Sequence, residues 1–593
     1  MTSYLYVLSI GPVQDFIAAA RRTRDLWFGS YLLSDISRAA AAKIADLGGL
    51  LIFPALARGD SRLQSPELET ELEAFNVANI VLAELPEGAD PQTVSTKAQN
   101  AAYRKWLEYA EGAKEEAGSL VRDDIWNAQI NDIIEFNTAW VPLGSDYAAS
   151  RKRLMRLFAG RKSIRNFCQA KEAQGIPKSS LDGARETVLK NNRRPYGELA
   201  LKMRLSENEQ LCAVGLTKRL AGGRRIAFPS VTRVALEPWI RRIRRDGGDA
   251  DRYLTEIGEL CAGENAFASG TGTKFYQEFP YDGQVCFPSH LTSTKRSLQQ
   301  ALTALPEDNP YRKDLDKLNE INKRLRTLLH IAGEPNPYFA VLVADGDHIG
   351  EAISKINSAG EHRDFSSNLS TFAGEARNIV EKSHHGYMVY SGGVDVLAFL
   401  PVDTCLKAAR VLHDRFEEKV PESRVTLSIG IAIGHTRNPL GDLLDYGRAA
   451  ERAAKEPNRN GLAVHLHIRG GGSPLKVREQ WKPKGQNGMD ERLATWIDLH
   501  TQNALPDKAA YDLLQMAGDY GEWKNPVPPG LLKKDLFRLL RRKKAGNGTR
   551  DVAEEDIESV LQGVESSDDL LRRATELVIA RRIAVAMTGG DNS

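Results

Sequence analysis

Short apolar runs of strand length alternate along this chain with longer segments in which apolar side chains recur at helical spacing. In the first 120 residues this pattern predicts a strand at 4–10, a helix containing Phe16, Ile17, Ala20 and Leu26, strands at 50–54 and 77–82, and a helix at 97–117. The order strand, helix, strand, strand, helix is that of a ferredoxin-like fold. The N-terminal part is therefore expected to form one small α+β domain.

The same order returns from residue 338. The segment "YFAVLVADGDHIGEAI" predicts a strand, a tight turn and a helix, and the runs 387–390 and 396–400 predict a hairpin closed by a Gly-Gly pair. A helix at 404–418, a strand at 425–433, a helix at 440–455 and a strand at 461–468 follow. The similarity indicates an internal duplication, and only the second copy has acids, Asp345 and Asp347, after its first strand.

Two further regions complete the chain. The residues between the two α+β domains predict a helical and polar region with basic clusters, and after the linker Arg469–Pro474 the tail predicts a helical domain with basic runs. A solvated helix face explains each basic cluster taken alone, whereas several clusters together favour an extended RNA- or protein-docking surface. The expected domains are 1–120, 121–334, 335–470 and 471–593.

Length and composition set limits on this picture. A chain of 593 residues is too long for one hydrophobic core, and a net charge of +2 restricts any nucleic-acid surface to a local patch. The five cysteines contain no CxxC pair and are expected to be buried, as in the reducing cytoplasm. No stretch approaches about 18 apolar residues, so we expect a cytoplasmic protein without a signal peptide or membrane span.

The second α+β domain carries the candidate chemistry. Asp345 follows a buried strand, Gly346 permits the backbone to approach phosphates, and Asp347 lies one residue further on. Nucleotidyl transfer needs a divalent metal ion such as Mg²⁺ or Mn²⁺, and carboxylates from two adjacent strands commonly hold it. A strand-to-helix turn with an N-capping aspartate explains "DGDHIG" equally well.

The predicted hairpin would supply the second half of such a site. In hairpins of the form Gly-Gly-Asp-Asp the first acid faces the metal, but Val394 stands at that position here. Asp395 remains, and because successive strand residues point to opposite faces, it is not expected to replace the missing ligand. An ordinary turn explains the hairpin as well. Lys455 ends the helix at 440–455, where it would either reach a triphosphate or simply complement the helix dipole.

Six segments, in this order, resemble the large, polymerase-like subunit of type III CRISPR effector complexes, in the III-B or Cmr branch. They are "SIGPVQDFIAAARRTRDLWFGSYLLS", "KSSLDGARE", "LCAVGLTKRL" with "FPS" after it, "DGDHIGEAI", "YSGGVDVLAFLP" and "IGHTRNPLGDLLDYGRAAERAAKE". The resemblance runs from about residue 9 to about residue 467 and is specific, because many motifs fall in order.

This resemblance implies an α+β fold of two ferredoxin-like palm domains of the cyclase and polymerase type, with a helical insert and a C-terminal helical domain. It implies ATP as substrate or ligand, Asp345 and Asp395 as catalytic residues, and Asp345, Asp347 and Asp395 as ligands of Mg²⁺ or Mn²⁺. The implied nucleotide-binding residues are Gly346, Asp347, Ser391, Gly392, Gly393 and Lys455. The implied partners are guide CRISPR RNA, target RNA and other Cmr-type subunits, and no membrane.

Two departures from the family pattern bear on activity. Larger members carry an N-terminal HD nuclease domain, but the first histidine here is His290, so we expect a form without that domain. Active palms use Gly-Gly-Asp-Asp with magnesium and ATP to make cyclic oligoadenylates when target RNA binds, and Val394 removes one of these acids.

The leading hypothesis is therefore a binding and scaffolding subunit with impaired synthesis. The alternative is an active metal-dependent nucleotidyltransferase that makes cyclic oligoadenylate or a related ATP-derived messenger, with Asp345, Asp347 and Asp395 sharing the metal. A free-standing cyclase is disfavoured, because the duplicated palm and the long helical regions would have no purpose there.

Overall fold

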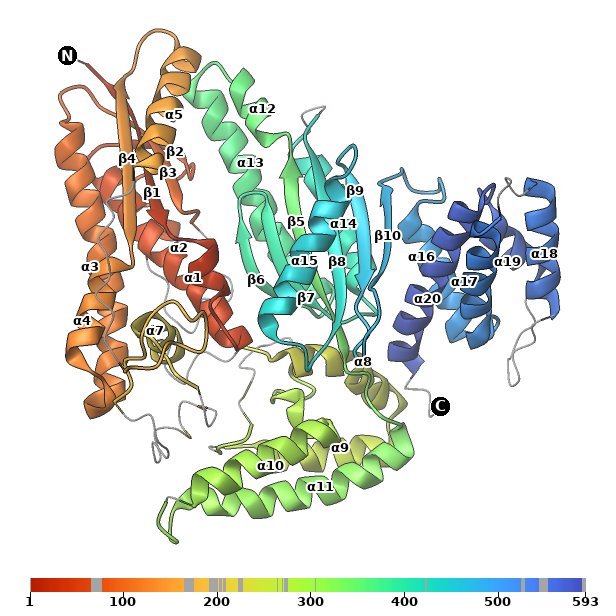
Figure 1. The fold of residues 1–593 in the computed structure, drawn as a ribbon. Helices are drawn as coiled ribbons and strands as arrows, with labels where there is room; N and C mark the ends of the chain where they lie inside the picture. The colour runs from red at the N-terminus through yellow and green to blue at the C-terminus, as the bar shows by residue number, and fades with distance from the viewer. Residues whose placement is uncertain are drawn as a thin grey trace.

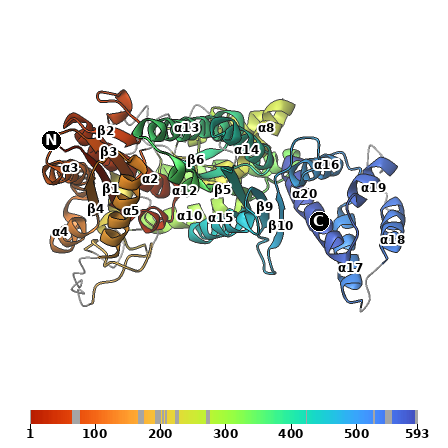
Figure 2. The same ribbon diagram turned by 90° about the horizontal axis from the view of Figure 1, so that it is seen from above.

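The structure, a computed structural model, describes most of the chain. The described residues are 2–64, 77–164, 175–190, 201, 205, 209–221, 228–263, 265–268, 270, 276–303, 305–421, 424–523, 528–542 and 553–588. They form two β-sheets, a helical region below them in Figure 1, and C-terminal helices on the far side of the second sheet. Figure 2 shows these parts following one another from the first sheet to the C-terminal helices. The predicted α+β class with two palm-like domains is confirmed.

The first sheet has the order β2-β3-β1-β4, and its strand pairs are antiparallel. Its domain comprises β1 (Tyr4–Gly11), α1 (Gln14–Ala18), α2 (Thr23–Asp46), β2 (Leu50–Phe53), β3 (Ile80–Leu85), α3 (Pro91–Ala117), α4 (Asp123–Asp132), β4 (Glu135–Pro142) and α5 (Tyr147–Ser163). Leu5 and Val7 pack with α5, whereas Tyr6 and Leu8 pack with α2 and α3. Because helices cover both faces, β1 is apolar at almost every position.

Three details of this domain differ from the prediction. The helix after β1 is broken, and Ala20 lies between α1 and α2, where Lys218 donates hydrogen bonds to the freed carbonyl oxygens of Phe16 and Ala19. β3 begins three residues later than predicted, at Ile80. β4 pairs with β1 although the sequence was interpreted as helical there, so the first sheet extends beyond residue 120.

The second sheet has the order β10-β9-β8-β5-β7-β6, with β8 and β9 parallel and the other neighbours antiparallel. Its elements are β5 (Tyr338–Asp347), α12 (Ile349–Lys355), α13 (Ala359–Asn378), β6 (Tyr387–Gly392), β7 (Asp395–Leu400), α14 (Cys405–Lys419), β8 (Thr426–His435), α15 (Leu440–Lys455), β9 (Gly461–Leu466) and β10 (Leu475–Gln480). Ala340 and Leu342 pack with α13 and α14, whereas Val341 packs with α15. The predicted hairpin is present, but α13 was not predicted, and β10 extends the sheet into the expected helical tail.

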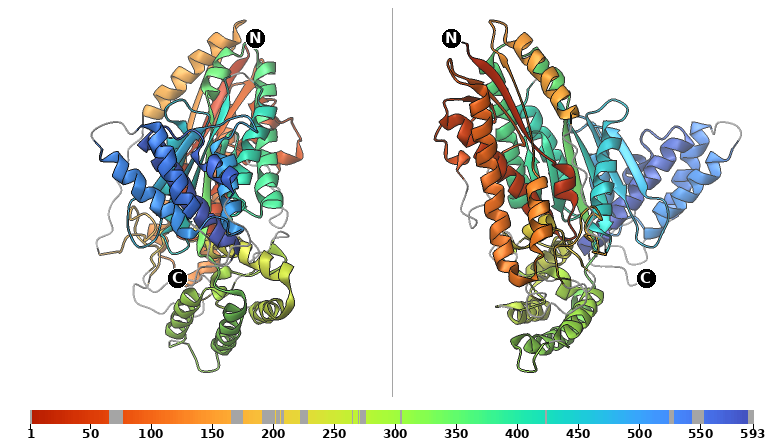
Figure 3. Two further views of the ribbon diagram at one scale, coloured as in Figure 1. Left: turned by 90° about the vertical axis from the view of Figure 1, so that its right-hand side faces the viewer. Right: turned by 60° about the vertical axis from the view of Figure 1, so that its left-hand side comes forward.

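The remaining described elements are helical. The region between the sheets contains α7 (Ala213–Leu220), α8 (Val231–Asp246), α9 (Gly248–Cys261), α10 (Pro288–Leu302) and α11 (Lys313–Ala332). The tail contains α16 (Met489–Thr501), α17 (Asp507–Gly521), α18 (Pro529–Arg542), α19 (Glu554–Leu561) and α20 (Ser567–Thr588). Figure 3 shows the tail helices clustered beside the second sheet. No helix within the described ranges is long and apolar enough to span a membrane.

Four of the five cysteines are free thiols in buried positions, as predicted: Cys212, Cys261, Cys286 and Cys405. The fifth, Cys168, lies outside the described residues. The same holds for residues 165, 222–227, 543 and 544 of the predicted basic clusters at 151–165, 218–230 and 538–544.

Candidate functional site

The end of β5 and the hairpin formed by β6 and β7 lie side by side. Ala344 of β5 pairs with Val396 of β7, so the next position in the register brings Asp345 opposite Asp395. The two carboxyl groups are joined by a hydrogen bond. The expectation that Asp395 faces away from the site is therefore wrong. The turn consists of Gly393 and Val394, and the alternation of the strand begins only at Asp395.

This carboxyl pair holds a proton. Asp395 is exposed as a whole residue, but its carboxyl group is largely removed from water. This loss of hydration raises the pKa of Asp395 to about 8, together with the hydrogen bond to Asp345 and the negative charge of Asp345. Burial alone would raise the pKa of Asp345, but hydrogen bonds from Asp395 and Lys455 hold that pKa below its usual value. At neutral pH the pair therefore carries one negative charge.

Lys455 neutralises that charge. It comes from the last turn of α15, as predicted, and its ammonium group contacts the Asp345 carboxylate and lies 2.5 Å from Oε1 of Glu451. Burial would lower the pKa of Lys455, but these two carboxylates raise it instead. Lys455 thus belongs to the site, and in this structure its charge is balanced by acids.

Asp347 has a different environment. Its side chain is fully buried, and its Oδ2 accepts hydrogen bonds from the hydroxyls of Ser428 at 2.7 Å and Thr426 at 2.9 Å and from the backbone N–H of Asn460 at 3.1 Å. Arg459 approaches Oδ1 at 3.4 Å. The predicted metal and nucleotide ligand is thus already bonded to the ends of β8 and β9, and the bonds stabilise the domain.

Gly346 and Val394 are in close contact. A Cβ atom on Gly346 would lie 2.8 Å from Cβ of Val394 and 3.0 Å from Ile349 Cγ1, so only glycine fits. Val394 is half-buried and packs with Ile349 against the core of the second domain. An apolar side chain therefore covers the turn at which phosphates were expected.

The other hairpin residues differ in their placement. Ser391 is buried, and its hydroxyl donates to the carbonyl oxygen of Ala373 in α13 at 3.1 Å, so it points away from the carboxyl pair. Gly392 has no room for a side chain, because the Tyr390 hydroxyl occupies that space. Gly393 has a φ of +68°, and its missing Cβ would lie 3.8 Å from the ring of Phe53 in β2. The hairpin tip therefore contacts the first domain.

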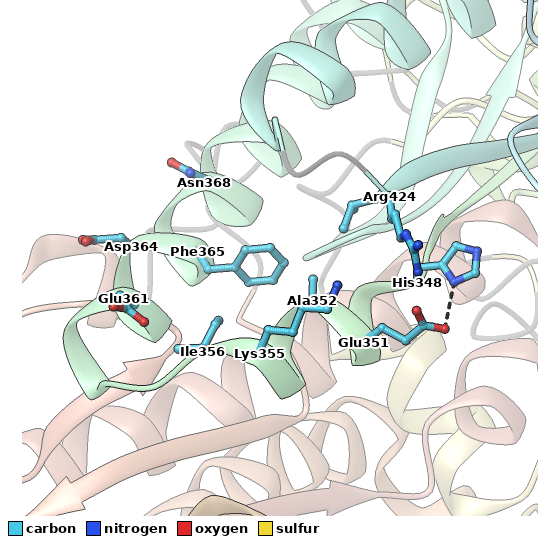
Figure 4. Close-up of a pocket in the computed structure, with 11 residues that line it drawn as sticks. His348, Glu351, Ala352, Lys355, Ile356, Glu361, Asp364, Phe365, Asn368 and Arg424 are labelled. Carbon is cyan, nitrogen blue, oxygen red and sulfur yellow. Dashed lines mark hydrogen bonds and ion pairs between the residues drawn. The ribbon is translucent and has the colours of Figure 1, made fainter. Parts of the chain in front are cut away.

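A cavity of about 520 Å³ lies beside this site, between α12, α13 and the start of β8 (Figure 4). It is lined by His348, Glu351, Ala352, Lys355, Ile356, Glu361, Asp364, Phe365, Asn368, Arg424 and Val425. The Phe365 ring points into it, and His348 Nδ1 lies 3.0 Å from Glu351. The sequence interpretation missed the wall of this cavity that α13 forms, because it missed that helix, although Phe365, Leu369 and Phe372 recur at helical spacing.

The carboxylates do not form a complete magnesium site. Val394 offers no ligand, Oδ2 of Asp347 already accepts three hydrogen bonds, and Asp345 is paired with Lys455. Across the described ranges, no group of three or more His, Cys, Asp or Glu side chains is arranged to hold a metal ion.

Two parts of the chain match known protein families. Residues 5–111 match the family described as CRISPR-associated protein Cmr2, N-terminal, and residues 338–463 match the family described as Cas10/Cmr2, second palm domain. A curated relative, the CRISPR system Cmr subunit Cmr2 of Pyrococcus furiosus, is 24% identical over 560 residues and covers 78% of this chain. The chain spans 61% of the length of that relative.

Solved structures share the fold. The type III-B Cmr-β structure in the apo state has a TM-score of 0.60, and Cmr-β bound to cognate target RNA has a TM-score of 0.63. Each matching chain is 14% identical, and the matches cover 94% of this chain and 78% and 80% of theirs. This chain is therefore similar to Cmr2 in its N-terminal domain and to Cas10/Cmr2 in its second palm domain.

Proposed function

We propose that this chain is the large subunit of an RNA-guided type III-B CRISPR antiviral complex, in which it contacts guide and target RNA. The two family matches support this proposal, as does the fold shared with Cmr-β, one structure of which is bound to cognate target RNA. Other Cmr-type subunits would be its partners, and the cytoplasm its location.

Within that complex the second palm domain would bind ATP. The phosphates would lie beside Val394 at the edge of the Gly346 turn, and the base would enter the adjacent cavity, where Phe365 offers a ring for stacking and Asp364 and Asn368 offer polar groups. Lys455 would meet the phosphates once it exchanged one of its two carboxylate partners for them. A cavity of about 520 Å³ is within the usual size range of small-molecule sites.

Cyclic oligoadenylate synthesis would be impaired in this palm. The observation that carries this proposal is Val394, whose apolar side chain covers Gly346 where the family has a metal-binding acid. Asp347 cannot compensate without abandoning the hydrogen bonds that hold β8 and β9. Mg²⁺ or Mn²⁺ would therefore improve ATP binding only weakly.

The pairing of Asp345 with Asp395 favours a second candidate, an active nucleotidyltransferase. Two carboxyl groups opposite each other on adjacent strands resemble half of a metal site. This candidate requires Asp395 to lose its proton and Lys455 to release Asp345. It therefore demands more rearrangement than nucleotide binding alone.

Calorimetric titration of the full chain with ATP, with and without magnesium, tests the proposal. We expect binding in both conditions, magnesium enhancement of less than a few-fold, and about tenfold weaker binding in Phe365→Ala, from the loss of one stacking contact. Trp523→Ala, which removes an exposed tail ring, is the control. Absence of ATP binding would refute the nucleotide proposal. A strong magnesium enhancement that disappears in Asp345→Ala would favour the second candidate.

A further inference from the structure

Helix α5 carries an unusual concentration of positive charge. Five of its side chains, Lys152, Arg153, Arg156, Arg161 and Lys162, are exposed, and the helix itself contains no acid. Within the described part of the chain, none of these five cations forms an ion pair with a carboxylate. Lys162 makes a cation–π contact instead, with its ammonium group 4.6 Å from the centroid of the Phe158 ring.

Cations in the basic clusters of α8 and α20 are paired with acids within the protein. In α8, Arg241 lies 2.6 Å from Asp403 and Arg244 lies 2.5 Å from Asp251. In α20, Arg573 lies 3.0 Å from Glu576. These clusters are explained by the fold itself. The charge of α5 has no such partner.

Helix stability does not explain the charge either. Arg161 and Lys162 lie in the last turn, where cations complement the helix dipole. Lys152, Arg153 and Arg156 lie further forward, and like charges four residues apart, such as Lys152 and Arg156, destabilise a helix slightly. A local cost without a structural gain is typical of residues that serve a ligand.

We infer that the outer face of α5 binds the phosphodiester backbone of RNA. Met155 and Leu157 are exposed among the forward cations, whereas the exposed positions before Arg161 are the small residues Ala159 and Gly160, so that a sugar-phosphate chain can approach the C-terminal half of the helix closely. Five exposed positive charges along one helix suit a continuous run of phosphates. Contacts with phosphates would position the RNA without reading its sequence. This inference rests on the proposed function, in that it identifies where the RNA of such a complex would lie.

The inner face of α5 fixes the cations in place. Arg151 donates hydrogen bonds of 3.0 Å to the carbonyl oxygens of Ser354 and Ile356 at the end of α12, and the Tyr147 hydroxyl lies 2.7 Å from His362 of α13. Figures 1 and 3 show α5 against the upper ends of both palm domains. Since α12 and α13 also form the cavity wall, RNA on this helix would run past the proposed nucleotide site.

The test uses the full chain, a fluorescently labelled single-stranded RNA of about 30 nucleotides, and anisotropy titrations over a range of salt concentrations. In K152Q/R153Q/R156Q we expect the slope of log affinity against log salt to fall by about 2, since each phosphate contact on single strands contributes about 0.7. The same relation predicts that the loss of affinity at 50 mM salt is about 20 times the loss at 200 mM salt. Circular dichroism verifies that the variant is folded.

A matched control removes three exposed cations of α18, K533Q/K534Q/R538Q, and should change the slope by less than half as much. An unchanged slope in the α5 variant, or an equal loss in the α18 variant, would overturn the inference. Polyglutamate is titrated in the same way. If it binds the wild type as tightly as RNA does, and if this binding is lost in the α5 variant, the surface serves acidic proteins instead of RNA. ATP affinity of the same proteins is measured separately, so a failure of the nucleotide proposal is distinguishable from a failure of this one.

Discussion

Replacing Asp347 with alanine should destabilise the second palm domain much more than replacing Asp345. The two residues are two positions apart on β5 and were both predicted to be ligands, but their surroundings differ. Asp347 is fully buried and accepts three hydrogen bonds of 2.7–3.1 Å from Ser428, Thr426 and Asn460. The Asp345 side chain is about one third exposed, and its ion pair with Lys455 is open to solvent.

The magnitude follows from these contacts. A hydrogen bond to a charged group contributes about 1.5–3 kcal/mol, and donors left unpaired in a buried position keep their full desolvation cost. Since the three donors share one acceptor oxygen, their contributions are not additive, and we expect a loss of about 3–5 kcal/mol in Asp347→Ala. At about 2–4 °C per kcal/mol, the thermal transition should fall by roughly 10 °C. Asp345→Ala removes a partly exposed ion pair and should cost less than about 1 kcal/mol.

Differential scanning calorimetry of the wild type, Asp345→Ala and Asp347→Ala measures both effects in one buffer. Asp347→Asn is a useful third variant, because it keeps the side-chain shape but brings an amide N–H₂ towards donors. A transition of Asp347→Ala within about 2 °C of the wild type would refute the structural role of this residue. A larger loss in Asp345→Ala than in Asp347→Ala would show that the two roles are exchanged.

Three other predictions concern the same region. The pKa of Asp395 is about 8 in the folded chain and 3.8 as a reference value, so the stability of the fold should decline as the pH rises from about 4 to 8. Asp395→Asn should flatten this decline, as measured by thermal unfolding at pH 5 and 9. An unaltered slope would contradict the shared proton. Gly346→Ala should lower the free energy of unfolding of the domain by about 1–3 kcal/mol in urea titrations, and the added change Val394→Gly should recover much of the loss. A wild-type free energy of unfolding in Gly346→Ala alone would disprove the close contact. Arg151→Ala removes the hydrogen bond to the carbonyl oxygen of Ile356 at the end of α12, so it should lower the free energy of unfolding by about 1–3 kcal/mol and weaken ATP binding in calorimetry. Wild-type values for both quantities would show that α5 does not support the cavity.

The strands and the hairpin could be predicted because their signals are local. Apolar runs of β-branched residues and a Gly-Gly pair between them specify a hairpin without any knowledge of the rest of the chain. The pairing of Asp345 with Asp395 depends instead on where the turn ends. The alternation rule was applied from Val394, but Val394 belongs to the turn, so the predicted face of Asp395 was wrong.

The environment of Asp347 was beyond sequence reasoning for another reason. Its donors Thr426, Ser428 and Asn460 lie 79, 81 and 113 residues further along the chain, and only the paired strands bring them together. The edge strands β4 and β10 were missed because both mix polar and apolar residues and are only partly buried. Helix α13, in contrast, had a readable pattern of apolar positions.

The central claim, that Val394 disables a palm whose shape is otherwise intact, is tested most directly by Val394→Asp in the assembled complex with guide and target RNA. The close approach of residue 394 to Gly346 means that the new carboxylate would lie beside the turn, near Asp345. Liquid chromatography of ATP reactions with magnesium then compares the chain as it is, Val394→Asp, and Val394→Asp with Asp345→Ala. We predict an increase in cyclic oligoadenylate of about 10²–10³-fold in Val394→Asp, by analogy with other single groups that stabilise a transition state, and its loss in the double variant. Equal and substantial synthesis by the unchanged chain and by Val394→Asp would contradict the claim.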